Sequence, residues 1–269
     1  MTDTLTPPPA TSSANPRLRV TGPRVVLSEW TKFRSLRSTL YTLLLAVVFM
    51  VGLGALISAI TANQPGGLEP GQSAISASLS GIFFAQLAIG VLGVLLISGE
   101  YGTGMIRSSL TAPRRLPVVW AKALVLGVVT LLLSEIASFV GFFIGQATLG
   151  THSVAFSADG ALRAVIGTGL YLTVVAVIGV ALGFIIRSTA GGIAALVGIL
   201  LVLPGVVSIL PQTWQDNIGP YLPSTAGAAL YDLHPEAGSL DPWTGFGVFC
   251  LYAVVGLIAG AFVLNRRDA

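Results

Sequence analysis

Six stretches of the sequence are each apolar over about 20 residues, and they constrain the fold more than any other feature. They cover residues 39–60, 79–98, 123–146, 165–186, 189–210 and 245–264. A helix rises about 1.5 Å per residue, so each stretch is long enough to cross a hydrocarbon core of about 30 Å. Because 54% of the residues are hydrophobic and only 9% are charged, we predict an all-α integral membrane protein with six transmembrane helices.

The sequence before the first apolar stretch differs in composition from the rest. Residues 1–23 are rich in Pro, Thr and Ser and contain no apolar run. Such a composition cannot bury enough apolar surface to fold, so we predict a disordered cytoplasmic arm and no signal peptide. Residues 24–267 form one membrane domain that contains all six predicted spans.

The basic residues indicate how the spans are oriented. When alternate loops are assigned to alternate sides, all of the 14 Lys and Arg residues except Arg163 fall on one side. Because cytoplasmic loops carry an excess of Lys and Arg, we predict that both termini are cytoplasmic and that the protein is a multi-pass protein of the cell membrane. The net charge of +3 follows from this bias, so we infer no binding to nucleic acid.

Residues 24–40 (RVVLSEWTKFRSLRSTL) have the pattern of an amphipathic helix that lies in the membrane interface. The apolar positions recur at spacings of three and four, while Lys32, Arg34 and Ser35 fall opposite them. Trp30 is placed at the depth of the lipid headgroups. A simple surface anchor without a mechanical role is an equally good interpretation of this segment. The apolar positions are Val26, Trp30, Phe33, Leu36 and Leu40.

A compact polar segment, GEYGTGMIRSSLTAPRRLPVVWAK, separates the second apolar stretch from the third. Met105, Ile106 and Leu110 are spaced for one face of a short helix, and Pro113 ends it because the residue before a proline is pushed out of the α region. A short amphipathic helix that faces the cytoplasm favours docking to a partner. The alternative is a solvated loop whose arginines only obey the positive-inside rule.

The segments EWTKFRSLRST, SGEYGTGMIRSSL with PRRLPVVWAK, and PYLPSTAGAAL resemble the permease subunit of type-2 ATP-binding-cassette (ABC) exporters, in particular its actinobacterial branch. The resemblance covers about residues 24–267. It implies a cytoplasmic coupling helix over Glu100–Leu110 that seats in the ATPase subunit. The chain departs from the shortest family pattern by having Gly104 directly after Gly-Thr. The matched positions are Glu100 (acidic position), Tyr101, Gly102, Thr103, Arg107, Pro113 and Arg115, with Lys122 opening the third span.

The resemblance also implies the partners and the activity. The expected partners are a cytoplasmic ABC ATPase, a second identical or related permease subunit, and membrane lipids. The chain has two lysines, preceded by Thr31 and Ala121, and therefore no Gly-Lys pair for a phosphate-binding loop. We predict that it is not an enzyme, that it needs no cofactor, and that ATP binds to the partner. The expected function is ATP-driven export of a lipid, drug or other amphipathic molecule.

Glu135 is a carboxyl near the middle of the third apolar stretch, where a charged side chain is costly. The favoured interpretation is a structural carboxyl bonded to a neighbouring helix. The alternative is a contact in the substrate path or a proton-coupling site.

The fifth apolar stretch contains Pro204 and Gly205, which predict a bend or break. A span that ends in short re-entrant pieces and a simple kink followed by an ordered loop fit this pattern equally well.

Three other functions are alternatives to export by a permease subunit. An ion-coupled secondary transporter would favour paired ionisable residues at the midplane and two similar halves, neither of which is visible. An intramembrane hydrolase would need a nucleophile with a base or a zinc motif, and no His-Glu-x-x-His occurs. A permease-like subunit that senses cargo or confers resistance without transport would share every motif and stays open.

Overall fold

The computed structural model describes residues 22–35, 37–64, 73–102, 116–234 and 238–267. In these ranges the regular structure is helical and there is no strand. Six of the helices found there are long and apolar enough to cross a membrane. The predicted all-α membrane fold is confirmed. Residues 1–21 of the predicted arm lie outside the described residues, and its last two, residues 22–23, belong to the first helix.

The first three spans are built from several helical pieces. The first span joins α2 (Arg37–Val48), a π-helical stretch (Phe49–Leu53) and α3 (Gly54–Ala62). The second joins α4 (Ala74–Leu79) to α5 (Ile82–Gly102), and the third is α7 (Leu116–Leu149) with a short 3₁₀ turn (Gly150–His152). The break between α4 and α5 lies against the π-helical stretch, since a Cβ at Gly81 would be 2.2 Å from the Met50 carbonyl oxygen. Only glycine fits there.

The last three spans are α8, a composite helix and α13. They comprise α8 (Ala161–Ile186), then α9 (Thr189–Val197), a π-helical stretch (Gly198–Val202) and α10 (Leu203–Val207), and finally α13 (Pro242–Arg267). The fifth span therefore ends at Val207, before the expected residue 210. Its π-helical stretch lies directly before Pro204, whose ring would clash with the carbonyl four residues earlier in a regular α-helix.

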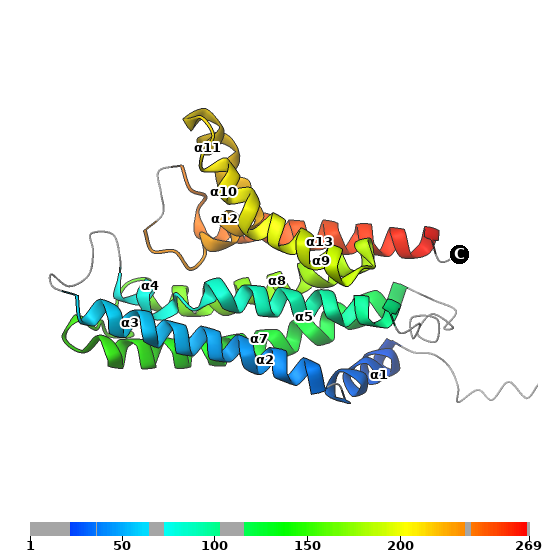
Figure 1. Ribbon diagram of the computed structural model, residues 1–269, viewed down its shortest axis with the longest axis horizontal. Helices are drawn as coiled ribbons and strands as arrows, with labels where there is room; N and C mark the ends of the chain where they lie inside the picture. Colours follow the sequence, from blue (N-terminus) through cyan, green and yellow to red (C-terminus); the bar gives the residue numbers. More distant parts are fainter. Residues whose placement is uncertain (1–21, 36, 65–72, 103–115, 235–237, 268–269) are drawn as a thin grey trace, which may run out of the picture.

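Short helices follow the fifth span instead of a simple loop. They are α11 (Gln212–Ile218), a 3₁₀ turn (Gly219–Tyr221) and α12 (Pro223–Ala228). Figure 1 shows α10 and α11 rising away from the long helices, while α12 leads back to the start of α13. The interruption expected from Pro204 and Gly205 is therefore present, and it takes the form of several short helices.

Helix α8 is the centre of the bundle, because it packs against α5, α7 and α13. Its approach to α5 is close: a Cβ at Gly93 would lie 2.3 Å from the Ala176 carbonyl oxygen, and one at Gly179 would lie 2.3 Å from the Gly90 carbonyl oxygen. A Cβ at Gly256 would lie 3.0 Å from the Ala181 Cβ, and one at Gly260 would lie 2.9 Å from the Phe184 Cβ. These small residues are used for packing within one chain.

The long helices run back and forth, so their ends gather at two ends of the bundle (Figure 1). We call one of them the basic end; it holds the starts of α2 and α7 and the ends of α5, α8 and α13. The described basic residues lie at this end, apart from Arg163. The Arg163 guanidinium instead donates to the carbonyls of Ala229 and Leu230 in the connection after α12.

Helix α1 (Gly22–Ser35) lies at the basic end, at an angle to α2 (Figure 1). The segment predicted as one helix over residues 24–40 includes α1 and the start of α2, which run at an angle to each other, and Leu40 belongs to the first span; Leu36 between them lies outside the described residues. Phe33 is buried and stacks on Trp30 with ring centroids 6.5 Å apart, while Trp30 remains 42% exposed. Arg34 is exposed, as the amphipathic pattern predicts. Residence of α1 in the membrane interface stays a prediction.

Candidate functional site

The candidate site is the last turn of α5, where the second span meets the polar segment. Glu100, Tyr101 and Gly102 belong to this turn, so the first three residues of the expected coupling helix continue α5 without a break. The other expected coupling residues lie outside the described residues: Thr103, Arg107, Pro113 and Arg115. What the structure adds is the set of contacts that hold the turn in place.

Lys122, two turns into α7, is the centre of these contacts. Its Nζ donates to Oε1 of Glu100 at 2.6 Å and to Oε2 of Glu29 at 2.6 Å. Lys32, on α1, donates to Oε1 of Glu29 at 3.0 Å. We call Glu29, Lys32, Glu100 and Lys122 the charge cluster. It joins α1, the end of α5 and the start of α7 through side chains whose formal charges cancel.

Three of the four side chains of the charge cluster are largely buried, while Lys32 is 34% exposed. The side chains of Lys122 and Glu29 are 1% and 6% exposed, and that of Glu100 is 13% exposed. Taking these ions out of water costs several kcal/mol each, which close pairing offsets. Removal of a single partner leaves an uncompensated buried charge and costs about 3–5 kcal/mol. The cluster is therefore a strong constraint on geometry, whatever its net contribution to stability.

One atom of the cluster has no partner in the described part of the chain. Oε2 of Glu100 is buried and accepts no hydrogen bond there. Buried carboxylate oxygens are normally satisfied, so an unmet one marks a place where a further donor would be stabilising. Glu100 is the first residue of the expected coupling helix, so this oxygen lies at the start of the segment that the sequence assigns to docking.

The resemblance gives Glu100 as the acidic position of a coupling helix that seats in the ATPase subunit. Oε1 pairs with Lys122 of the same chain. The amphipathic pattern did not single out Glu29, which the structure places in the charge cluster. Its position could have signalled it: Glu29 follows Val26 by three residues and precedes Phe33 by four, so it shares their buried face.

A second set of contacts holds the same turn from the other side. The Arg187 guanidinium lies 5.0 Å from the centroid of the Tyr101 ring, and its Nη2 donates to the Val263 carbonyl of α13 at 3.2 Å. Arg187 follows α8 with φ of 59°, a left-handed conformation that non-glycine residues rarely adopt. Ser98 and Thr189 share a hydrogen bond of 2.9 Å. The end of α5 is thus connected to α8, α9 and α13 as well as to α1 and α7.

The glycines of this turn leave one face open. A Cβ at Gly99 or at Gly102 would meet no atom within 4 Å. Among the described residues, no atom packs against the Cβ position of either glycine.

Glu135, the other candidate residue, lies far from the charge cluster in the middle of α7. Its carboxyl group rests on Gly169 of α8, where a Cβ would lie 2.5 Å from the carboxyl carbon and from Oε1. Oε2 is buried and has no hydrogen-bond partner among the described residues. The carboxyl thus contacts a neighbouring helix, while a bond from it to that helix stays a prediction.

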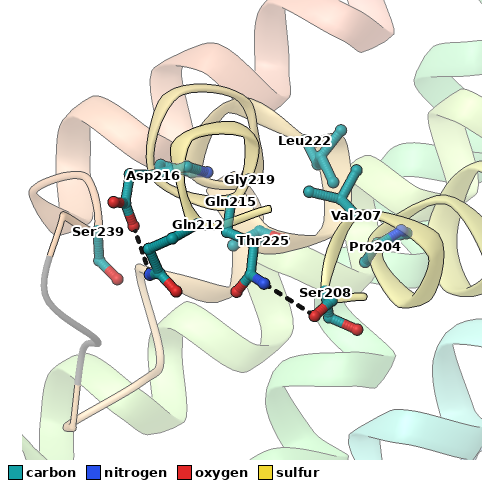
Figure 2. A pocket seen from close by; sticks show the side chains of 11 residues that line it. Pro204, Val207, Ser208, Gln212, Gln215, Asp216, Gly219, Leu222, Thr225 and Ser239 are labelled. Carbon is teal, nitrogen blue, oxygen red and sulfur yellow. Dashed lines mark hydrogen bonds between the residues drawn. The ribbon is translucent and has the colours of Figure 1, made fainter. Parts of the chain in front are cut away.

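A cavity of about 280 Å³ lies at the end of the bundle opposite the basic end, among α10, α11 and α12. Figure 2 shows Gln212 bonded to Asp216 and Gln215 bonded to the Ser208 carbonyl at its rim, with Val207 and Leu222 on one wall. Its polar groups mostly satisfy one another or the backbone. The cavity lies between the short helices that follow the fifth span.

A comparison with known protein families matches most of the chain to one family of membrane proteins. Residues 25–205 match the family described as ABC-2 family transporter protein. The matched region runs from α1 into α10 and includes the whole charge cluster and Glu135. No curated protein matches the chain.

Proposed function

The chain belongs to the ABC-2 transporter family, and on that premise we propose that it exports an amphipathic molecule with energy from ATP hydrolysed by a separate ABC ATPase. A lipid or a drug would be such a cargo. As a member of this family the chain is the membrane subunit of an ABC transporter and works with an ABC ATPase subunit. Two permease subunits, identical or related, form the path between them.

The charge cluster is the observation that carries this proposal. A segment that docks on an ATPase is useful only if its movement reaches the spans. The polar segment is joined at Gly102 to the α5 turn that Glu100 anchors to Lys122, and Lys122 is bonded in turn to Glu29 on α1. Displacement of the docking segment would therefore move α5, α7 and α1 together.

The size of these interactions suits a conformational switch. A hydrogen bond to a charged group contributes about 1.5–3 kcal/mol, which is similar to the differences that separate populated conformations. ATP-dependent closure of two ATPase subunits would favour one arrangement of the docking segments. The permease pair would then alternate between inward-facing and outward-facing states.

The character of the spans supports an amphipathic cargo. The buried polar side chains of the described spans mostly bond to backbone carbonyls of their own helix, as Thr130, Ser134 and Thr168 do. Such spans offer few free polar groups to a hydrophilic solute. Large apolar side chains are exposed along α2, α7 and α13, among them Leu44, Leu132 and Val255. An apolar or amphipathic molecule can approach these faces from the bilayer.

The test is reconstitution. The chain is co-expressed with the ABC ATPase encoded nearest to it, and the purified complex is placed in proteoliposomes. Co-purification of the two proteins, and ATP hydrolysis stimulated by a candidate amphiphile together with its movement, are the expected results. Co-purification and stimulated hydrolysis without movement of any amphiphile would favour the sensing or resistance subunit. Failure of every ABC ATPase to bind would contradict the proposal.

A further inference from the structure

Glu135 lies in the middle of the third span, and one oxygen of its carboxyl group has no hydrogen-bond partner among the described residues. It lies on α7, a helix of 34 residues, between two turns that are otherwise apolar on their outer side. Oε2 is buried and accepts no hydrogen bond from the described part of the chain. At the basic end, by contrast, each residue of the charge cluster has at least one partner. A carboxyl kept only for packing would be expected to have a hydrogen-bond partner, as the carboxyls of the charge cluster do.

The polar side chains around Glu135 do not satisfy it. Ser138 donates to the Val165 carbonyl at 2.8 Å, and Thr173 donates to the Gly169 carbonyl at 2.8 Å. Ser134 donates to the Thr130 carbonyl one turn earlier. Each of these hydroxyls carries a single proton and has used it on a backbone carbonyl. The donor that Glu135 lacks must therefore come from outside these three side chains.

Helix α7 offers that donor a way in from the bilayer. Leu132 and Ile136, the neighbours of Glu135 on its outer side, are 61% and 63% exposed. Glu135 itself is half-buried, at the boundary between this exposed apolar face and the contact with α8. A molecule that lies along α7 with its tail on Leu132 and Ile136 can bring a head group to the carboxyl. Gly169 beneath the carboxyl holds it at that boundary, since a side chain there would occupy its place.

The chemistry of the missing partner follows from the group and its surroundings. An isolated carboxylate in an apolar environment is costly, and a cation or N–H donor at hydrogen-bond distance is what relieves the cost. We propose that Glu135 and the exposed apolar face of α7 around Leu132 and Ile136 form a binding site for a cationic amphipathic molecule. The proposal rests on the proposed function, because this molecule would be the cargo or a cargo-like ligand of the permease.

Photo-crosslinking of the full-length chain in phosphatidylcholine nanodiscs tests the site directly. Two probes share one alkyl tail with a diazirine and differ only in the head, which is a primary amine in one and a hydroxyl in the other. The amine probe should label peptides of α7 about tenfold more than the hydroxyl probe, a difference of about 1.4 kcal/mol. Labelling of α13 near the exposed Val255 serves as the internal reference for partition into the bilayer.

Three variants make the test specific. Glu135→Gln keeps the shape of the side chain and should abolish the preference for the amine head. Gly169→Ala should reduce the preference as well, because its Cβ would displace the carboxyl without changing any charge. Gly127→Ala is the matched control on the same helix contact: its Cβ would meet only Val177 at 3.8 Å, an ordinary contact, and the preference should stay. Size-exclusion profiles establish that each variant is folded.

Three results would overturn the proposal. The first is equal labelling by both probes in the unaltered protein, and the second is an amine preference that survives Glu135→Gln. The third is a Glu135→Gln variant in which permease subunits no longer pair while labelling is unchanged, which would assign the carboxyl to contact with a second subunit. The binding assay contains no ATPase, so its outcome is independent of whether ATP-driven export is established.

Discussion

The Nζ atom of Lys122 lies 2.6 Å from Oε1 of Glu100, and both side chains are largely removed from solvent. The two residues lie near the two ends of the polar segment, Glu100 at the end of the second span and Lys122 near the start of the third. Their ion pair closes the ends of that segment on each other. Any force applied to the segment is thus delivered to two spans at once.

The first prediction concerns the stability of the charge cluster. Lys122→Met leaves Glu29 and Glu100 buried without their shared cation, and we expect the free energy of unfolding to fall by about 3–5 kcal/mol. Thermal unfolding of the purified protein in detergent measures the change. The control is Arg34→Ala, which removes an exposed cation of α1 and should shift stability by less than about 0.5 kcal/mol. Equal shifts for both variants would show that the cluster is not a buried ion network.

The second prediction concerns the contact between α5 and α8. Gly179→Ala introduces a Cβ that would lie 2.3 Å from the Gly90 carbonyl oxygen, so the two helices must separate. Overpacking of this kind costs about 1–3 kcal/mol, and we expect a lower unfolding temperature and a lower yield. Gly52→Ala is the control, since a Cβ at that position meets nothing within 4 Å. Unchanged stability of the Gly179 variant would mean that the spans tolerate a looser fit.

The third prediction concerns orientation in the membrane. In a Cys250→Ala background, a cysteine at Ser108 should be shielded from an impermeant thiol reagent in intact cells, and one at Ser239 should react. The reason is the segregation of every Lys and Arg except Arg163 to one side. Permeabilised cells, in which both sites should react, provide the control. Labelling of Ser108 from outside would exclude the proposed topology.

The sequence predicted the spans well because each of them is a long apolar run, a signal that needs no tertiary information. It also located the interruption near Pro204, because proline acts locally on the backbone. What it missed depends on contacts between residues distant in sequence. Glu29 and Lys122 are 93 positions apart, and nothing in either local segment specifies the other as its partner.

The division of residues 24–40 illustrates a second limit. The apolar spacing continues from Val26 through Leu40, so periodicity alone gives one helix. In the structure α1 ends at Ser35 and α2 begins at Arg37. The break separates a helix that packs on the start of α7 from a span, and only the packing distinguishes the two parts. Likewise, the unmet Oε2 of Glu135 is a property of its surroundings, and the sequence could only mark the residue as costly.

The last prediction separates coupling from folding within the charge cluster. Glu100→Gln and Glu29→Gln each remove one carboxylate partner of Lys122 and leave the other in place, at 2.6 Å in both cases. Glu29 also pairs with Lys32, so we expect Glu29→Gln to cost at least as much stability as Glu100→Gln, with each bond to a charged group contributing about 1.5–3 kcal/mol. Only Glu100 lies on the turn that leads into the polar segment.

Transport should therefore distinguish the two variants. In proteoliposomes that contain the ATPase partner, Glu100→Gln should retain ATPase binding but lose most cargo movement and cargo-stimulated hydrolysis, because the docking segment is no longer fixed to α7. Glu29→Gln should keep the larger part of both activities, since its bond connects α7 to α1 and does not adjoin the segment. Measuring both variants at equal amounts of assembled complex removes the effect of stability. Equal loss of transport in the two would mean that the cluster only stabilises the fold, and full activity of both would remove the cluster from the path of coupling.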